Sequence, residues 1–329
     1  MKQFKIDFCK NKKIYFTISI CLIAIGIIFN IIFGTQLAIE FRGGTQLNYS
    51  YTGSVSQSDV EKIAEEAVGS QVSVRLSSDV KVSNGDTKNE ISISLPGSKT
   101  ISTDTQKNVL TQLQKQYPKA NLAIENSSSI DPSMGSDFFK KCLVAVAITV
   151  VLLILYIAAR FRKIGGVPAA VTAIIALLHD VLMVYFTFVV FRLPVDQNFI
   201  AVVLTILGYS LNDTIIIYDR IRENRTILGP RTNIVEVVNK SINQTLTRSL
   251  FTALCTFAVI TCVFIVGSIF GLSSIRTFAL PMMIGVACGC YSSICIAGPL
   301  YAAWEVHKTG KTKKPEAAAE QKEIPASEI

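Results

Sequence analysis

An acidic residue deep in an apolar stretch is the clearest candidate for chemistry in this chain. Asp213 lies in the run Phe199–Tyr218, and five uncharged residues separate it from the next charge, Asp219. Insertion scales place aspartate at roughly 2.5 to 3.5 kcal/mol at the centre of a spanning helix. A chain keeps such an acid when it has a partner, a water path or a function, so we expect Asp213 to be functional. The alternative is a buried ion pair that only fixes the helix register.

A possible partner for this acid lies on the next apolar run. If that run begins near Asn243, Arg248 lies at a depth comparable to that of Asp213, on a helix of opposite direction. Burial disfavours a charged carboxylate and a nearby guanidinium favours it, so movement of the arginine would change the proton affinity of Asp213. Arginine itself keeps its proton. The pair could therefore couple proton passage to helix motion, although Arg248 could instead extend to the membrane interface.

Three more polar residues accompany the pair. Asn212 precedes Asp213, and His179-Asp180 interrupts the apolar run 164–191. His179 and Asp180 either extend a proton relay or form a satisfied polar pair in a helix bundle. Polar residues three and four positions apart share one side of a helix, and we expect such stripes to face the bundle interior. The stripes are Thr172, Ala176, His179, Met183 and Thr187; Thr205, Gly208, Tyr209, Asn212 and Asp213; and Thr245, Arg248, Thr252 and Thr256.

The composition indicates a membrane protein. Half of the 329 residues are hydrophobic and 17% are charged, with long charge-free runs, whereas soluble domains carry about 25% charged residues. The net charge of +8 comes from basic residues beside apolar runs, which argues against nucleic-acid binding. Seven of the eight cysteines lie inside apolar runs, and no Cys/His spacing typical of a metal site exists. We expect no disulfide framework, metal or cofactor.

Six apolar runs are long enough to span a membrane. They cover residues 14–33, 138–159, 164–191, 199–218, 243–266 and 277–303. The basic flanks are 1–13, 160–163, a polar loop predicted over 219–240, and a disordered tail over 305–329. The positive-inside rule then places both termini in the cytoplasm and residues 34–137 on the other side of a cytoplasmic (inner) cell membrane. Asp196 and Asn198 are expected to cap the fourth span.

The polar segment 34–137 predicts a small α+β domain. Alternating apolar residues indicate strands, and two helical stripes lie between them. The expected strands are 45–51, 71–76, 90–95 and 122–125, the helices are 56–68 and 103–117, and Asn84-Gly85-Asp86 is a turn. This β-α-β-β-α-β order is the ferredoxin-like split unit. The segment lacks His, Cys and any nucleophile–base pair, so we expect no catalysis there and no enzyme activity in the chain.

Two motifs resemble a known family. Gly208–Asn224, reading GYSLNDTIIIYDRIREN, resembles the fourth-helix motif of the SecD/SecF family, and Glu40–Thr45, reading EFRGGT, resembles the FxGGT signature after the first helix of that family. Gly43 and Gly44 of the signature permit a bend or a close backbone approach. The resemblance covers about residues 4–304. It implies that Asp213 and Arg248 belong to a proton path.

The resemblance also implies partners. It predicts one half of a resistance-nodulation-division (RND) type transporter, which acts with SecD and uses the proton-motive force to promote protein export. The expected partners are SecD, the SecYEG translocon, a YidC-type insertase and the translocating unfolded polypeptide. The alternative is an RND-type proton-coupled exporter of small molecules or lipids. Such exporters usually carry larger external domains and twelve spans, and the external segment here has only about 100 residues.

Overall fold

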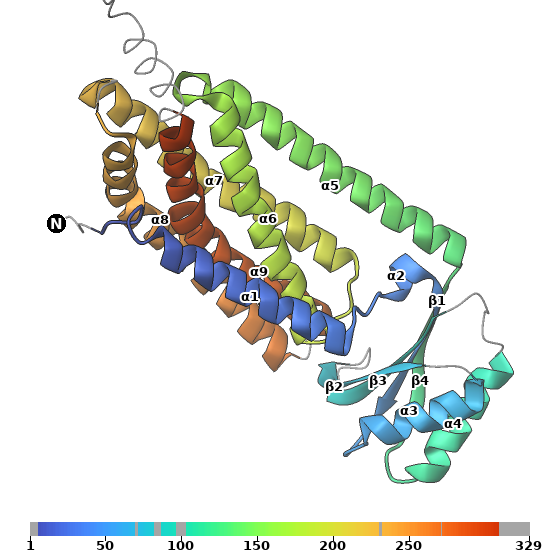
Figure 1. The fold of residues 1–329 in the computed structure, drawn as a ribbon. Coiled ribbons are helices and arrows are strands. Elements are labelled where there is room, and N and C mark those ends of the chain that lie inside the picture. The colour runs from blue at the N-terminus through green and yellow to red at the C-terminus, as the bar shows by residue number, and fades with distance from the viewer. Residues whose placement is uncertain are drawn as a thin grey trace, which may run out of the picture.

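The structure is a computed structural model that describes residues 6–69, 72–81, 87–96, 103–229, 232–270 and 272–308. Long helices lie side by side, and a small sheet with two helices lies beyond one end of them (Figure 1). The turn predicted at Asn84–Asp86 and the tail from residue 309 fall outside the described residues.

Six helices of the described chain are long and apolar enough to cross a membrane, as predicted. Five of them are single α-helices, and the sixth, α9, continues through a π-helical turn, Ser293–Ala297, to Lys308. Their bounds are α1 Lys12–Phe33, α5 Pro132–Arg160, α6 Gly166–Val190, α7 Gln197–Leu228, α8 Ile234–Ile269 and α9 Ser273–Ser292.

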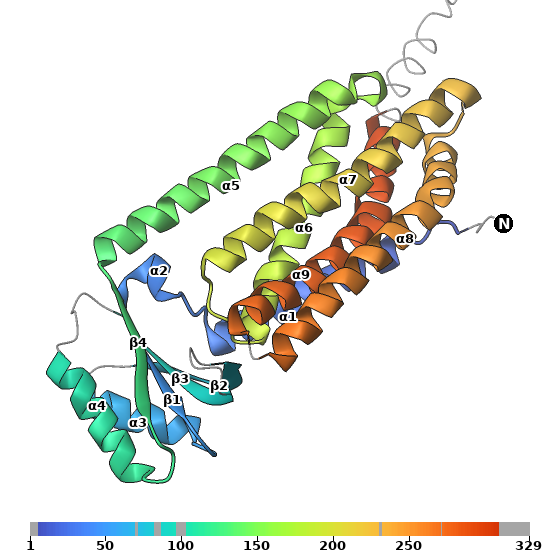
Figure 2. The ribbon, with the colours of Figure 1, turned by 180° about the vertical axis from the view of Figure 1, so that it is seen from behind.

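Three of these helices form the centre of the bundle. In their most apolar windows, 56% of α6, 56% of α7 and 67% of α9 are buried, against 11% of α1, 6% of α5 and 17% of α8. Figure 2 shows α5 standing apart along one side of the bundle and α8 at the other side. The apolar side chains that α1, α5 and α8 leave exposed suit contact with lipid or with another membrane protein.

The helices extend beyond the apolar runs, so the loop predicted over 219–240 is wrong. Helix α7 continues to Leu228 and α8 begins at Ile234. Charged residues favour helix as well as apolar ones do, and ion pairs between Arg220 and Glu223 and between Arg222 and Asp219 support the extension of α7. The hydropathy pattern therefore predicted the apolar part of each helix but not the residues at which the helix begins and ends.

Two other helices differ from the predicted runs. Helix α6 is continuous through His179-Asp180, because polar side chains can point sideways without breaking the backbone ladder. Helix α5 begins at Pro132, before the predicted residue 138, because Asp131 accepts a hydrogen bond from Ser133 N at 2.8 Å and caps the helix. Asp196 caps α7 as predicted, accepting from Asn198 N and Phe199 N.

The small domain contains the predicted order of strands and helices. Its elements are β1 Gly44–Tyr51, α3 Gln57–Val68, β2 Ser73–Lys81, β3 Thr87–Pro96, α4 Thr103–Gln116 and β4 Ala123–Ile130. The sheet order is β2-β3-β1-β4, with antiparallel neighbours throughout. Alternate strand residues such as Tyr49, Ile91 and Ile93 are fully buried with Val60 of α3 and Leu113 of α4, which form the core on one face of the sheet.

The two glycines of the EFRGGT motif form the junction between bundle and sheet. Gly43 ends the short helix α2, Ile39–Arg42, with φ 75°, and Gly44 opens β1 with φ 138°. Both backbone angles strongly favour glycine. A Cβ on Gly135 of α5 would lie 2.8 Å from the backbone nitrogen of Gly43. The motif thus provides both the bend and the close backbone approach that the sequence suggested.

Candidate functional site

Asp213 lies near the middle of the 32-residue helix α7 and is buried, with 1% of its surface exposed. Neither carboxylate oxygen has a hydrogen-bond partner among the described residues. The hydroxyl of Ser249, on α8, is the neighbouring polar group, and it too is buried without a partner at normal hydrogen-bond length. A charged carboxylate in this position is poorly stabilised, so the site requires a proton, a water molecule or an approaching cation.

Arg248 is the cation that could approach Asp213. It lies next to Ser249 on α8 and interacts electrostatically with Asp213. The ion pairs of the described chain do not include Asp213 with Arg248, and the arginine side chain is exposed at the surface of the bundle. The two charges therefore influence each other without direct contact in this conformation. Their roles in a proton path stay a prediction.

The predicted polar stripes do not all face the interior. On α6, Thr172, Ala176 and His179 are buried as expected. Part of the other two stripes does not face the interior, so the expectation is wrong there. On α8, Arg248 and Thr252 are exposed, and three residues of the α7 stripe are exposed as well. Those three are Thr205, Gly208 and Asn212.

The exposed part of the α7 stripe has room for close contact with another helix. A Cβ built on Gly208 meets no atom within 4 Å, so this side of α7 is open. Small and hydroxyl-bearing residues at such spacing let helix backbones approach closely and hydrogen-bond in membranes. We call the surface of Thr205, Gly208, Asn212, Arg248 and Thr252 the α7–α8 face. Its composition suits a protein partner better than lipid.

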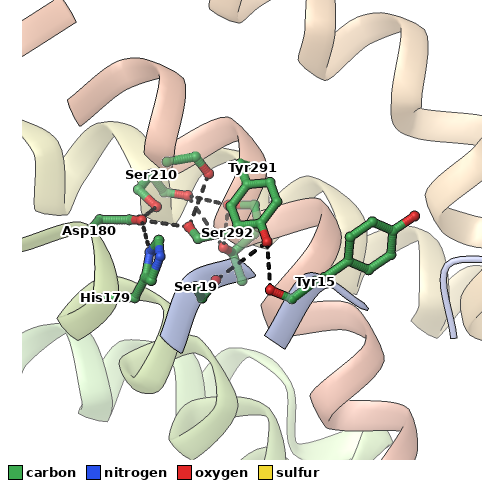
Figure 3. A network of polar contacts seen from close by, with 10 residues as sticks. Tyr15, Ser19, His179, Asp180, Ser210, Tyr291 and Ser292 are labelled. Carbon is green, nitrogen blue, oxygen red and sulfur yellow. Dashed lines mark hydrogen bonds and ion pairs between the residues drawn. The ribbon is translucent and has the colours of Figure 1, made fainter. Parts of the chain in front are cut away.

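A second polar cluster lies where α6, α7 and α9 meet (Figure 3). Asp180 of α6 is fully buried, and its Oδ1 lies 3.0 Å from His179 Nδ1. Its Oδ2 accepts hydrogen bonds from Ser210 Oγ of α7 at 2.6 Å and Ser292 Oγ of α9 at 2.7 Å. The dyad therefore joins the three central helices through one carboxylate. The sequence analysis named His179 and Asp180 but missed both serines.

The contacts around this cluster explain how the serines reach it. A Cβ on Gly289 of α9 would lie 3.0 Å from Ser210 Cβ, so α7 and α9 approach closely there. Ser293 donates to the carbonyl oxygen of Ser210 at 3.1 Å, and its hydroxyl lies 2.9 Å from that of Thr214. The π-helical turn begins at Ser293, and such turns often occur at functional sites. The Gly285-xxx-Gly289 spacing and the Ser292-Ser293 pair were the signals in the sequence.

The described residues contain no group of three or more His, Cys, Asp or Glu side chains that could hold a metal ion. All eight cysteines are free thiols. The carboxylates, hydroxyls and imidazole of the two clusters can hold and pass protons, whereas the guanidinium of Arg248 keeps its proton.

A comparison with protein families bears directly on this arrangement. Residues 109–307 match the family model described as "Protein export membrane protein SecD/SecF, C-terminal". The chain belongs to the SecD/SecF family. The matched region contains α5 to α9 and therefore both polar clusters.

Individual SecD/SecF relatives agree with this assignment. The chain is 31% identical to the protein translocase subunit SecF of Alicyclobacillus acidocaldarius, over 96% of this chain and 98% of the relative. It is 32% identical to the corresponding SecF of Sebaldella termitidis, over 93% and 92%. It is 33% identical to the protein translocase subunit SecDF of Bacillus subtilis, over 92% of this chain but 38% of that longer protein.

A solved structure gives the same family. The crystal structure of SecDF from Thermus thermophilus, a translocon-associated membrane protein, matches with a TM-score of 0.76 and 27% identity. The match covers 92% of this chain and 39% of the SecDF chain. The chain is thus a multi-pass membrane protein of a protein-transport family, and it corresponds to the smaller part of the SecDF proteins.

Proposed function

We propose that this chain is an accessory subunit of the Sec protein-export machinery that acts with a SecD-type partner and uses the proton-motive force to promote polypeptide translocation. Its relatives are named protein translocase subunit SecF and SecDF, which supports the role in protein export. In the SecDF relatives, a region like this chain is joined to a longer remainder. In the proposal, a SecD-type partner supplies the counterpart of this remainder.

The observation that carries the proposal is the unpaired carboxylate of Asp213 close to an uncovered polar face. Among the described residues, the two buried oxygens of Asp213 have no hydrogen-bond partner, and Arg248 of the α7–α8 face, on the adjacent helix, forms no ion pair with Asp213. In the proposed cycle a SecD-type partner covers this face. Protonation neutralises Asp213, and approach of Arg248 favours its deprotonation, so helix movement and proton transfer drive each other.

The remaining parts of the chain take their roles from the predicted topology. Both termini lie in the cytoplasm, and the ferredoxin-like domain of residues 34–137 lies on the opposite side of the inner membrane. There it meets the emerging unfolded polypeptide, near SecYEG and a YidC-type insertase. The ion pair of Arg160 with Asp219 joins α5 to α7 at the end rich in basic residues, which supports a cytoplasmic location for this end.

Co-purification tests the proposal. Affinity-tagged chain, extracted in mild detergent from cells that make their own Sec proteins, should recover a SecD-type subunit and the translocon channel. Export measured in vesicles should fall when the chain is depleted and return when it is restored. Recovery of the chain without these partners, together with small-molecule efflux by the chain alone, would support the RND-type exporter instead.

A further inference from the structure

The dyad of His179 and Asp180 is a buried titratable pair that the proposed cycle at Asp213 does not use. Asp180 has no exposed surface, and His179 has 6%. Two of the three contacts of the carboxylate come from the neutral hydroxyls of Ser210 and Ser292. Within the described part of the chain, its ion-pair partner is His179, and no lysine or arginine reaches it.

The second ring nitrogen of His179, Nε2, is available for a proton. Nδ1 faces Asp180 at 3.0 Å, while Nε2 is buried with no hydrogen-bond partner among the described residues. A neutral imidazole that donates through Nδ1 leaves a bare, basic Nε2, and an imidazolium leaves an unused N–H there. In either state Nε2 is the atom at which a proton can arrive or leave without breaking the contact with Asp180.

The charges around the dyad decide how many protons it holds. Among the described residues, the titratable groups that interact with the dyad are a neutral thiol and a phenol, and Asp213 lies one helical turn from Ser210 along α7. The thiol is Cys288, which interacts with Asp180, and the phenol is Tyr291, whose ring lies beside that of His179, both on α9. Without a proton the dyad would be an isolated negative charge in a buried site, which is strongly unfavourable. With one proton it is neutral overall, as an imidazolium–carboxylate pair with the proton on Nε2.

We infer that His179 and Asp180 hold one exchangeable proton between them, and that loss of this proton loosens the junction of α6, α7 and α9. This inference rests on the proposed proton-driven function and adds a second proton-linked site to it. When the N–H bond at Nε2 breaks, the proton passes to a water molecule that has entered beside Nε2, and the electron pair stays on nitrogen. The carboxylate is then left without its counter-charge, so the dry junction becomes unfavourable and water entry is favoured.

The position of Ser210 links this site to Asp213. Ser210 and Asp213 lie three residues apart on α7, with Ser210 directed to Asp180 and Asp213 close to Ser249 of α8. A change in the dyad alters the contact of α7 with α6 and α9, and a change at Asp213 alters its contact with α8. One rigid helix therefore carries both proton-linked contacts.

A neutral version of the dyad separates proton exchange from packing. The double variant H179Q/D180N retains a donor and an acceptor at the two positions but cannot hold or release a proton. It should assemble with the partner subunit at normal abundance, yet lose most of its stimulation of export and the part of the pH profile that belongs to the dyad. Export and a pH profile equal to those of the unmodified chain would overturn the inference and leave a structural role.

A spectroscopic measurement covers the case in which the double variant fails to assemble. The chain has two histidines, His179 and the exposed His307. Selective ¹⁵N-histidine labelling of an H307Q chain, reconstituted in bilayers with its partner, therefore reports on His179 alone. We expect the Nε2 signal to change with pH between protonated and unprotonated forms. An Nε2 signal that stays unprotonated over the whole range in which export is active would overturn the inference.

Parallel measurements on D213N keep the two proposals apart. If D213N exports normally, the proton role of Asp213 fails whatever the dyad does. If D213N loses stimulation while H179Q/D180N exports with an unchanged pH profile, the proposed function stands and the inference about the dyad fails alone.

Discussion

Substitution of Asp213 by asparagine should leave the protein folded and assembled but remove its stimulation of export. The side chain keeps its size and loses the titratable group. Because neither carboxylate oxygen has a hydrogen-bond partner within the described ranges, the ionised acid bears an uncompensated cost of several kcal/mol. A buried amide with unmade hydrogen bonds costs only about 1–3 kcal/mol. We therefore expect D213N to be no less stable than the native chain.

The functional loss can be estimated from the membrane potential. One elementary charge moving through about 100 mV releases about 2.3 kcal/mol, which biases the coupled step roughly fortyfold, since about 1.4 kcal/mol is a factor of ten. D213N cannot bind and release a proton at this position, so it loses this bias at each cycle. Collapsing the potential with an ionophore should lower export by the native chain to the level of D213N and leave D213N unchanged.

The assay is translocation of a secretory protein into membrane vesicles, with D213N and native chain at matched abundance. Asp219→Asn is the matched control, because Asp219 lies on the same helix but is 34% exposed and pairs with Arg160 and Arg222. Exposed ion pairs contribute only about 0–1 kcal/mol, so D219N should export normally. Native-level, potential-dependent export by D213N would refute the assignment of Asp213.

Three other predictions follow from the fold. Replacing residues 44–130 by a short linker, which Gly44 pairing with Ile130 across the sheet permits, should preserve membrane insertion and partner binding but impair export; normal export would leave the domain without a role in translocation. Gly208→Leu should block recovery of the SecD-type partner without unfolding the chain, since a Cβ at position 208 meets nothing within 4 Å. Gly285→Leu should instead destabilise the chain itself, because its Cβ would lie 2.7 Å from a side-chain carbon of Ile206. Thermal unfolding and co-purification with the partner distinguish the two outcomes. Burial, and less strongly Glu125, raises the pKa of Glu90. The contribution of Glu90 to the stability of the small domain should therefore be full below the ordinary carboxyl pKa and be lost as pH rises through the raised value. Hydrogen exchange in β3 should show this pH dependence in the native chain and not in Glu90→Gln.

The sequence predicted the functional candidates whose charge conflicts with an apolar surrounding. Asp213 was identifiable because an acid inside an apolar run is costly wherever the neighbouring helices lie. The strands and helices of the small domain were identifiable from local periodicity. The helix ends were not, because they depend on caps such as Asp131 and on charged turns beyond the apolar run of α7. Hydropathy carries no information about either feature.

Long-range contacts were also beyond the sequence. Ser210 and Ser292 are ordinary residues in apolar helices, and they matter because α7 and α9 bring both hydroxyls to one oxygen of Asp180 across 30 and 112 sequence positions. The separation of the α7 stripe into a buried Asp213 and an exposed Asn212 likewise depends on where α8 packs. Periodicity gives the side of a helix, and tertiary packing decides what covers that side.

The exposure of Arg248 bears on whether this chain can work alone. An arginine at the centre of a lipid-facing helix costs roughly 2.5 to 3.5 kcal/mol on insertion scales, and the Thr252 and Asn212 side chains of the same face add to the unfavourable contact with lipid. A covering partner removes this cost and excludes water from the neighbourhood of Asp213, which strengthens the interaction of its charge with Arg248. Binding of the partner and operation of the proton site therefore use the same residues. Arg248→Leu should accordingly preserve or even increase the stability of the isolated chain, while it reduces export in the complex. Normal export by this variant, at matched abundance and with the partner bound, would show that the guanidinium has no role beyond reaching the membrane interface.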